Sequence, residues 1–368
     1  MTGRRAGACE SVLQEPEVGT NGRKVLVAVS GGVDSSTAAA LLLEAGFACT
    51  GVFMITNAHY ERAQSQAEDA ARRLGIRLDV LDLRQEFEQI IEYLCSEYAK
   101  GRTPNPCVVC NSHIKFGKLW EFARRRGLDH LSTGHYARVI NDSESFGLYS
   151  GTDSSKDQSY AMSMIDKQML AHMVLPIGNH SKKQVRELAA RFGLGTEHRS
   201  ESQEICFIPD NDYVAVLEKR CPELARRGRI VDSGGKVLGE HLGVHRFTVG
   251  QRRGLGMAMG RPYYVVGIEA ATNTVTLGPK EEVMHRKLLA RGVNWLTDGF
   301  VGSFRAKVKI RYNDEGSWAA VTPEAGAVVI EFDEPKLAIT PGQLAVFYVE
   351  DKNGSRVIGG GWIEETAD

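Results

Sequence analysis

The chain has 368 residues, of which 42% are hydrophobic and 25% charged, and its formal net charge is −1. This length allows two or three domains, and the composition is ordinary for a globular protein. The near-zero charge excludes a global basic field, so any nucleic-acid partner must be held by local patches. No apolar run approaches the roughly 20 residues that a bilayer core demands, so we expect no membrane partner.

The first 22 residues are polar and contain acidic as well as basic side chains. A secretory signal needs an apolar stretch, and transit peptides are poor in acidic residues. We therefore expect residues 1–22 to form a disordered tail and the protein to be cytoplasmic. Seven cysteines in a large chain without a secretory signal argue against a disulfide framework and favour metal binding or catalysis for clustered ones.

Strands and helices alternate along the first third of the chain. Apolar β-rich runs predict strands at residues 24–30, 47–54 and 78–83, and the segments 35–44, 61–74 and 85–100 are typical of helices. This alternation predicts an α/β fold, a doubly wound parallel sheet with helices on both faces. Ligands of such sheets bind at the carboxyl ends of the strands, so we expect the chemistry there.

A predicted loop and then a change from helical to β-rich sequence follow. The prolines of Thr103–Pro106 predict a loop that also carries Cys107 and Cys110, before a helix at 115–126, a strand at 130–132 and a helix at 182–192. From about residue 230 short β runs prevail, and the sequence from 306 onward is typical of a compact all-β module. We place domain boundaries near 210 and 282, which gives units at 23–210, 211–282 and 283–368.

A glycine–serine turn, Ser30–Ser36, joins the first strand to the first helix. Its two glycines let the backbone approach an anion, and the following helix offers free N–H groups. Asp34 would repel phosphates, a conflict that a bound Mg²⁺ removes. The string lacks a Gly-Lys-Ser/Thr ending and resembles the SGGxDS loop of the PP-loop ATP pyrophosphatases, which split ATP to AMP and pyrophosphate. The plain alternative is a strand–helix turn with a capping serine.

Two further positions are expected to face the same crevice. Met54 ends the second strand, and Gly134 follows the strand at 130–132. Adenine needs an apolar wall and a close backbone, which these residues supply, although each alone is typical of a core or a turn. The predicted ATP-binding residues are Ala28, Val29, Ser30, Gly31, Gly32, Val33, Asp34, Ser35, Met54 and Gly134.

Cys107 and Cys110 form a Cys-Val-Val-Cys motif, and Cys206 is a third candidate. In one interpretation Cys110 and Cys206 are a redox couple: a persulfide on Cys206 hands sulfur to an activated carbon, Cys110 helps to release it, and a disulfide forms. In a second, the three cysteines hold an iron–sulfur cluster with one iron free to carry sulfide. A zinc site lacks a second CxxC or CxxH pair, and a thioredoxin-like centre would not lie in a proline loop.

The other four cysteines lack such a context. Cys9 falls in the tail, Cys49 in a strand and Cys95 on a helix. We interpret these three and Cys221 as inert small apolar residues or exposed thiols.

Nine strings of the sequence agree with one family. They are Ser30–Ser36, Gly51–Met54, Gly101–Pro106, Cys110–Asn111, Ile114–Phe116, Thr133–Arg138, Lys156–Tyr160, Cys206–Ile208 and Gly250–Gly256. These strings are long and ordered, and together they resemble the tRNA-specific 2-thiouridylases. The resemblance runs from about residue 24 to the end of the chain.

The resemblance implies a PP-loop ATPase domain, a small central domain and a C-terminal β-barrel. ATP, with Mg²⁺, would adenylate the O2 of the wobble uridine of tRNA, and persulfide sulfur from a relay protein or a cysteine desulfurase would displace AMP. By matching position, Cys110 is the catalytic nucleophile and Cys206 the persulfide carrier. The positions matched to the target-base pocket are Asn105, Pro106 and Cys107. Those matched to tRNA contacts are His135, Lys156, Asp157, Gln158, Arg311, Tyr312 and Gln343.

Cys107 departs from the family's pattern, because many members carry aspartate there. An aspartate can accept a proton or ligate a cluster, whereas a cysteine ligates iron but is a poorer general base. The departure therefore favours the iron–sulfur interpretation and argues against a universal proton role for an aspartate at this position.

Basic residues gather at two places in the C-terminal half. Arg246, Arg252, Arg253 and Arg261 lie close together, and Arg305, Lys307, Lys309 and Arg311 alternate with apolar residues. On a strand this alternation puts four cations on one face, about 6.6 Å apart, in a ladder that can track a phosphate backbone. A solvated strand face is the plain alternative. Tyr312 is a candidate for stacking on an unpaired base, or else a core residue.

Two other functions fit parts of the sequence. Another adenylating PP-loop enzyme, such as an amide-forming synthetase, would keep the loop at 30–36 but would need no cysteine pair. A non-enzymatic RNA-binding protein would retain only a vestigial nucleotide fold. Loss of activity on changing Cys110 or Cys206 separates the first from a thiolase, and tRNA-dependent pyrophosphate release excludes the second.

Overall fold

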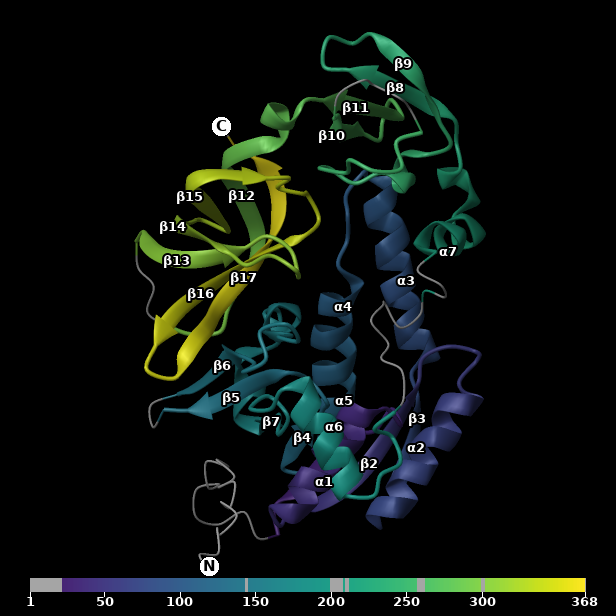
Figure 1. The fold of residues 1–368 in the computed structure, drawn as a ribbon, viewed down its shortest axis with the longest axis vertical. Helices are drawn as coiled ribbons and strands as arrows, with labels where there is room; N and C mark the ends of the chain where they lie inside the picture. The colour runs from purple at the N-terminus through teal and green to yellow at the C-terminus, as the bar shows by residue number, and fades with distance from the viewer. Residues whose placement is uncertain are drawn as a thin grey trace, which may run out of the picture.

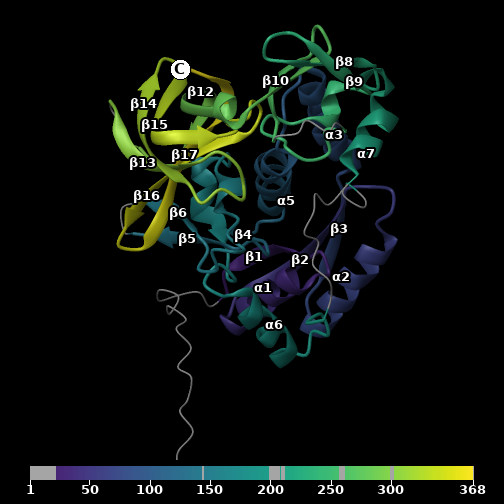
Figure 2. The same cartoon turned by 45° about the horizontal axis from the view of Figure 1, so that its top comes forward.

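In the part of the chain that the structure describes, the fold contains three β-sheets (Figure 1). The computed structural model describes residues 22–142, 145–198, 208, 212–256, 262–298 and 302–367. The parallel sheet lies at the bottom of Figure 1, the C-terminal barrel at the upper left and the small central sheet at the top right. Helix α3 (Arg84–Ala99) runs from the parallel sheet toward the central sheet, and Figure 2 shows the same arrangement from a second direction.

The first sheet is parallel throughout and has the strand order β3-β2-β1-β4-β7. Its strands are β1 (Lys24–Ala28), β2 (Ala48–Ile55), β3 (Leu78–Asp82), β4 (His130–Ser132) and β7 (Met173–Val174). The chain moves outward from β1 to β3 and then returns to β4 on the other side of β1. Such a reversal opens a crevice at the carboxyl ends of the two central strands, here β1 and β4.

Helices cover both faces of this sheet, because β1 points alternate apolar side chains to opposite sides. Val25 and Val27 pack against α1 (Val33–Glu44) and α2 (Glu61–Leu74). Leu26 points to the other side, into a cluster that contains Phe87 and Ile90 of α3. The expected doubly wound α/β fold is therefore confirmed. Helix α6 (Lys182–Arg191), also expected, packs against α1.

One helical run carries the Cys-Val-Val-Cys motif. α4 (Pro106–Val109), the π-helix η1 (Cys110–Lys118) and α5 (Leu119–Arg125) follow one another without a break. The expectation that Cys107 and Cys110 lie in a loop is wrong. Pro106 stands in the first turn, where its missing N–H group costs nothing, and the side chain of Asn105 caps the helix by accepting a hydrogen bond from Val108 N at 3.4 Å.

The central sheet has the order β10-β11-β8-β9 and follows α7 (Tyr213–Arg220). Its strands are β8 (Gly228–Asp232), β9 (Val237–His241), β10 (Tyr264–Glu269) and β11 (Thr274–Gly278). Short 3-10 helices occur at several places in the described chain: η2 (Ser159–Met162), η3 (Lys167–His172), η5 (Pro222–Leu224), η6 (Val244–Arg246) and η7 (Lys280–Val283).

The C-terminal strands close into an antiparallel barrel, in the order β12-β15-β14-β13-β16-β17 with β17 pairing back onto β12. The strands are β12 (Met284–Trp295), β13 (Phe304–Lys309), β14 (Ser317–Glu324), β15 (Ala327–Leu337), β16 (Leu344–Asp351) and β17 (Gly354–Thr366). Its core is filled by alternate side chains such as Ala306, Val308 and Phe347, all fully buried. The expected β-barrel is confirmed.

A hairpin of the N-terminal part extends the barrel sheet. β5 (Ala137–Asn141) pairs with β6 (Phe146–Ser150), and β6 pairs with β17, where Val357 lies opposite Leu148. Tyr149 of β6 also donates a hydrogen bond to Asp351 at 2.8 Å. The barrel is thus joined to the nucleotide-fold part by backbone hydrogen bonds as well as by packing.

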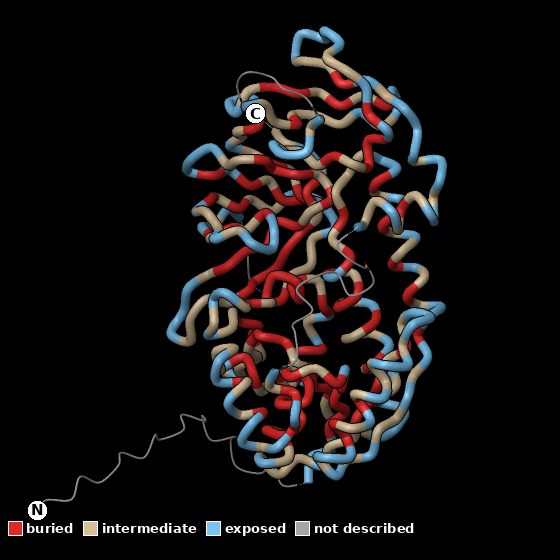
Figure 3. The backbone as a smooth tube through the Cα atoms, turned by 45° about the vertical axis from the view of Figure 1, so that its right-hand side comes forward, coloured by how far each residue is buried: buried red, intermediate tan, exposed pale blue. Residues whose placement is uncertain are grey.

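Buried segments run through the parallel sheet and through the barrel wall, with exposed turns around them (Figure 3). Within the described ranges no helix is long and apolar enough to cross a lipid bilayer.

Candidate active site

The glycine–serine turn occupies the crevice edge between β1 and α1. Gly31 has a positive φ of 77°, and a Cβ added there would lie 2.6 Å from Gln66 Cβ, so only glycine fits. The hydroxyls of Ser30 and Ser35 lie 3.1 Å apart, and Ser35 Oγ accepts a hydrogen bond from Ser30 N at 3.1 Å. Gly32 is the N-cap of α1 and makes no side-chain cap hydrogen bond. The first N–H groups of α1 therefore face a preformed turn, as an anion site requires.

Gly134 brings the end of β4 against the start of α1. A Cβ added to Gly134 would lie 2.7 Å from Ser35 N and 2.9 Å from the carbonyl carbon of Asp34. The loop after β1 and the residue after β4 therefore meet at one place, as predicted. Ala28 ends β1, and the buried Val29 donates its N–H to Val52 O at 2.9 Å. Met54 is half-buried near the end of β2.

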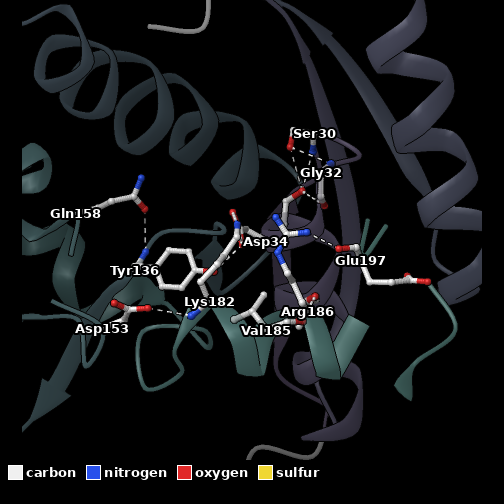
Figure 4. A network of polar contacts seen from close by, with 12 residues as sticks. Ser30, Gly32, Asp34, Tyr136, Asp153, Gln158, Lys182, Val185, Arg186 and Glu197 are labelled. Atoms are coloured by element: carbon white, nitrogen blue, oxygen red, sulfur yellow. Dashed lines mark hydrogen bonds and ion pairs between the residues drawn. The ribbon is translucent and has the colours of Figure 1, made fainter. Parts of the chain in front are cut away.

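Asp34 has two partners that the sequence did not indicate (Figure 4). Lys182 Nζ lies 2.8 Å from each of its carboxylate oxygens, and Tyr136 donates its hydroxyl to Asp34 Oδ1 at 2.7 Å. Lys182 is the first residue of α6, whose N-cap Ser181 forms a capping box with Gln184. The pair places a cation next to the phosphate loop. A capping serine before an amphipathic helix was the one sequence signal near Lys182.

The two motif cysteines occupy different environments. Cys107 is exposed in the first turn of α4, whereas Cys110 is buried at the start of η1. The π-helix begins at Cys110 and ends with Leu119 N bonded to Ile114 O, and such helices are frequent at functional sites. Asn111 fixes the segment by donating its side-chain amide to Ala161 O at 2.9 Å. Cys206 lies outside the described residues, so its pairing with Cys110 stays a prediction.

Of the remaining cysteines, Cys95 and Cys221 are neighbours. Burial, and then a hydrogen bond with the Cys221 thiol, raise the pKa of Cys95 to about 12. Burial raises the pKa of Cys49 in β2 to about 11. High thiol pKa values suit the inert role expected of Cys49 and Cys95. Cys9 lies outside the described residues.

The barrel holds the loop that leads to the motif. Gln343 donates its side-chain amide to the carbonyls of Thr103 at 3.0 Å and Pro104 at 3.1 Å, and Thr103 N donates to Pro341 O at 2.9 Å. Arg102 bonds Glu97 at 3.0 Å and Glu364 of β17 at 3.1 Å. Gln343, expected at a tRNA contact, thus contacts the loop carrying Asn105 and Pro106.

Tyr312 lies in the connection between β13 and β14. The residue is 41% exposed, and its ring meets that of Tyr160 edge-on, with 6.2 Å between ring centres. Burial raises the pKa of Tyr312 to about 12, and the negative charges of Asp157 and Cys107 add to the shift. Tyr312 is therefore partly open to solvent and not enclosed in the barrel core. Arg311 donates to Leu337 O at 2.9 Å.

Two of the expected tRNA contacts are buried. His135 is 7% exposed and lies 2.6 Å from Thr133 Oγ1, and its burial lowers its pKa well below the usual value. Asp157 accepts hydrogen bonds from Gly151 N and Ser159 N, each at 3.0 Å. Either side chain would have to become exposed to contact RNA. Gln158 accepts from Tyr136 N at 2.9 Å, and Lys156 is half-buried.

The expected ladder of four available cations is wrong. β13 ends at Lys309, so Arg311 lies beyond the strand. Arg305 is paired with Asp333 at 2.6 Å, and Lys309 with Asp157 at 3.4 Å. Acidic residues from other parts of the chain, which the local pattern does not reveal, neutralise these charges. In the other basic group, Arg246 is held by Glu218 at 2.5 Å, and Arg261 lies outside the described residues.

The fold and the loop at the switch point define an ATP-using enzyme of the PP-loop class. Three family models match the chain: a tRNA methyl transferase HUP domain at residues 23–210, a tRNA methyl transferase PRC-barrel domain at 215–279 and an aminomethyltransferase β-barrel domain at 285–363.

Curated relatives match over nearly their whole length. A tRNA-specific 2-thiouridylase MnmA of Carboxydothermus hydrogenoformans is 45% identical, covering 93% of this chain and 98% of the relative, and that of Syntrophotalea carbinolica is 44% identical with the same coverage. The chain belongs to the tRNA-specific 2-thiouridylase MnmA family. A solved 4-thiouridine synthetase–RNA complex with bound ATP overlaps 55% of this chain at 19% identity with a TM-score of 0.37, a likeness that supports no functional inference.

Proposed function

We propose that the protein is an ATP-dependent tRNA 2-thiouridylase. ATP adenylates the C2 oxygen of the wobble uridine, and sulfur carried as a Cys206 persulfide displaces AMP, which gives 2-thiouridine, AMP and pyrophosphate. The observation that carries the proposal is the meeting of the Ser30–Ser35 turn with Gly134 at the N-terminus of α1, because that contact builds an anion site at the switch point of the sheet.

The residues around the turn fit ATP. The N–H groups of α1 and the hydroxyls of Ser30 and Ser35 offer donors to phosphates, and Lys182 adds a positive charge beside them. Met54 and Gly134 are proposed to border the adenine. Mg²⁺ would supply neutralisation of the phosphate charge, with the Asp34 carboxylate as the oxygen ligand that hard cations prefer. Tyr136 and Lys182 hold the Asp34 carboxylate in place.

For sulfur transfer we propose Cys110 as the nucleophile and Cys206 as the persulfide carrier. Attack by the terminal sulfur on the adenylated C2 expels AMP, and Cys110 then attacks the inner sulfur of Cys206, so that the Cys110–Cys206 disulfide forms as the S–S bond to the transferred sulfur breaks. A thiol reductant restores both thiols. The burial of Cys110 shields the intermediate from water.

An iron–sulfur cluster on Cys107, Cys110 and Cys206 is the second form of this chemistry. The exposed Cys107 and the buried Cys110 lie one helical turn apart, which suits two ligands of one cluster. Among the described residues, which exclude Cys206, there is no group of three potential metal ligands. Iron content and visible absorbance of anaerobically purified protein decide this point: an iron-free protein that thiolates tRNA excludes the cluster.

The partners proposed are a tRNA with a wobble uridine and a sulfur donor, either a persulfide relay protein or a cysteine desulfurase, in the cytoplasm. Asn105, Pro106 and Cys107 would border the target base. The tRNA contacts proposed are His135, Lys156, Asp157, Gln158, Arg311, Tyr312 and Gln343. We divide the chain into a catalytic unit at 23–210, a central unit at 211–282 and a barrel unit at 283–368.

The test is to incubate unmodified tRNA with the protein, ATP, Mg²⁺, a cysteine desulfurase with its cysteine substrate as the persulfide donor, and a thiol reductant, and to analyse the digested nucleosides by mass spectrometry. The proposal expects 2-thiouridine in the tRNA and release of pyrophosphate that depends on tRNA. Pyrophosphate release with another acceptor and no thiolated uridine would favour a different adenylating PP-loop enzyme. RNA binding without pyrophosphate release would favour a non-enzymatic RNA-binding protein.

A further inference from the structure

The outer face of the β13–β14 hairpin carries an exposed tryptophan. Trp318, the second residue of β14, is 47% exposed and lies directly opposite Lys307 of β13 in the strand register. The alternation of the strand explains this exposure, because the next residue, Ala319, is fully buried in the barrel core. An indole ring left in solvent beside a cation is a feature of interaction surfaces.

Lys307 differs from the other cations of this face. Arg305 is in a two-point ion pair with Asp333, and Lys309 contacts Asp157. Lys307 has no ion pair with any acidic side chain in the described part of the chain. Its aliphatic stem lies against Gly316, where an added Cβ would be 3.0 Å from Lys307 Cγ. Lys307 is half-buried, lies opposite Trp318 in the strand register and has no acidic partner among the described residues, so its charge is available to a partner.

The connection between β13 and β14 carries a second exposed aromatic residue. Tyr312 in this connection is partly exposed, and its ring meets that of Tyr160 edge-on. Lys309 and Lys307 both lie along Gly316, two residues before Trp318. The hairpin therefore carries two exposed aromatic residues, Tyr312 in its connection and Trp318 on β14, and the Lys307 cation opposite Trp318.

We propose that Trp318 stacks on an unpaired base of the RNA substrate and that Lys307 contacts the adjoining phosphate. This inference rests on the proposed function, because it takes RNA as the partner. Base–aromatic stacking is tolerant of sequence, since every base has a π-face, so Trp318 would strengthen binding without selecting a particular base. The positive charge of Lys307 favours RNA over an apolar protein surface as the occupant.

The test measures the affinity of unmodified tRNA for the full-length protein over a range of salt concentrations. We expect Trp318→Ala to weaken binding by about 5- to 150-fold with an unchanged salt slope, and Trp318→Phe to restore most of the affinity. Lys307→Met should weaken binding and lower the magnitude of the salt slope by somewhat less than one, as loss of one phosphate contact requires.

Val237→Ala is the matched control, because Val237 of the central sheet is 53% exposed and has no place in the proposed interface. Melting curves of all variants establish that the fold is retained. Trp318→Ala that binds tRNA as tightly as the wild type overturns the inference while leaving the proposed function intact. Wild-type protein that fails to bind tRNA contradicts the proposed function itself.

Discussion

Lys182 Nζ lies 2.8 Å from both carboxylate oxygens of Asp34, so the first residue of α6 neutralises the acidic residue of the phosphate loop. The two residues are 148 positions apart in the chain. A carboxylate in a phosphate-binding turn would repel the phosphates, and the positive charge of Lys182 offsets this repulsion. Lys182 is only 12% exposed, so water screens the interaction weakly.

Lys182→Met should lower tRNA-dependent pyrophosphate release by about 100-fold, the scale of removing one preorganised group from developing charge. The measurement is the initial rate of pyrophosphate formation at saturating tRNA. Lys183→Met is the matched control, since Lys183 is the next residue of α6, is exposed and lies 3.9 Å from Glu187 at the helix surface. Equal rates in the two variants would remove Lys182 from the site.

Asp34→Ala should abolish adenylation and leave tRNA binding nearly intact, because Asp34 faces the phosphate turn and not the proposed RNA surface. Pyrophosphate release and tRNA affinity, measured on the same preparation, test this separation. Asp69→Ala, which removes an exposed carboxylate of α2 paired with Arg72 and Arg73, should change neither. A parallel loss of adenylation and tRNA affinity in Asp34→Ala would contradict the role assigned.

Gly134→Ala should disrupt ATP binding, since the added Cβ would lie 2.7 Å from Ser35 N, a backbone atom that cannot rotate away. The cost of such overpacking is typically about 1–3 kcal/mol. ATP affinity by calorimetry and the melting temperature report the two effects. Gly267→Ala serves as control, because its nearest neighbour would be at an ordinary 3.8 Å. Unchanged ATP affinity in Gly134→Ala would show that the β4–α1 contact does not shape the site.

The burial of His135 predicts how the stability of the fold depends on pH. Burial lowers its pKa in the folded state, so below the ordinary value of about 6.5 the unfolded chain binds a proton that the native protein does not. Stability should therefore fall as the pH drops from 7 to 5, by up to about 1.4 kcal/mol per pH unit for this group. His135→Gln should reduce that slope in urea unfolding, and the burial that lowers the pKa values of His130, His180 and His241 accounts for the slope that remains. An unaltered slope in His135→Gln would mean that this histidine does not titrate on unfolding.

Much of the nucleotide fold follows from local pattern. The segments 61–74 and 130–132 match α2 and β4, because periodic apolar residues and the glycine at 75 mark their limits. Cys107 and Cys110 lie in a helix and not in the predicted loop, because a proline that breaks a helix interior is tolerated in the first turn. The β5–β6 hairpin is not predictable from local pattern, because its pairing with β17 depends on residues about two hundred positions later.

The residues of the site likewise fall into those that local sequence predicts and those that it does not. The Ser30–Ser36 turn is recognisable because glycines, serines and the strand–helix context are contiguous. Lys182 is not, since only the packing of α6 on α1 brings it to Asp34. The prediction of four available cations on one strand face is wrong for a similar reason. Asp333 and Asp157, which neutralise Arg305 and Lys309, come from other elements. Long-range charge pairing leaves no local signal.

The central claim is that adenylation at the phosphate loop and sulfur transfer at Cys110 act on one uridine. The most direct test of this claim is mass spectrometry of tRNA that has been incubated with the Cys110→Ser variant, ATP, Mg²⁺ and a sulfur donor. The Cys221→Ser variant is the matched control. We predict pyrophosphate release and no 2-thiouridine with Cys110→Ser, and normal thiolation with Cys221→Ser. Thiolation by Cys110→Ser at the wild-type rate would contradict the claim.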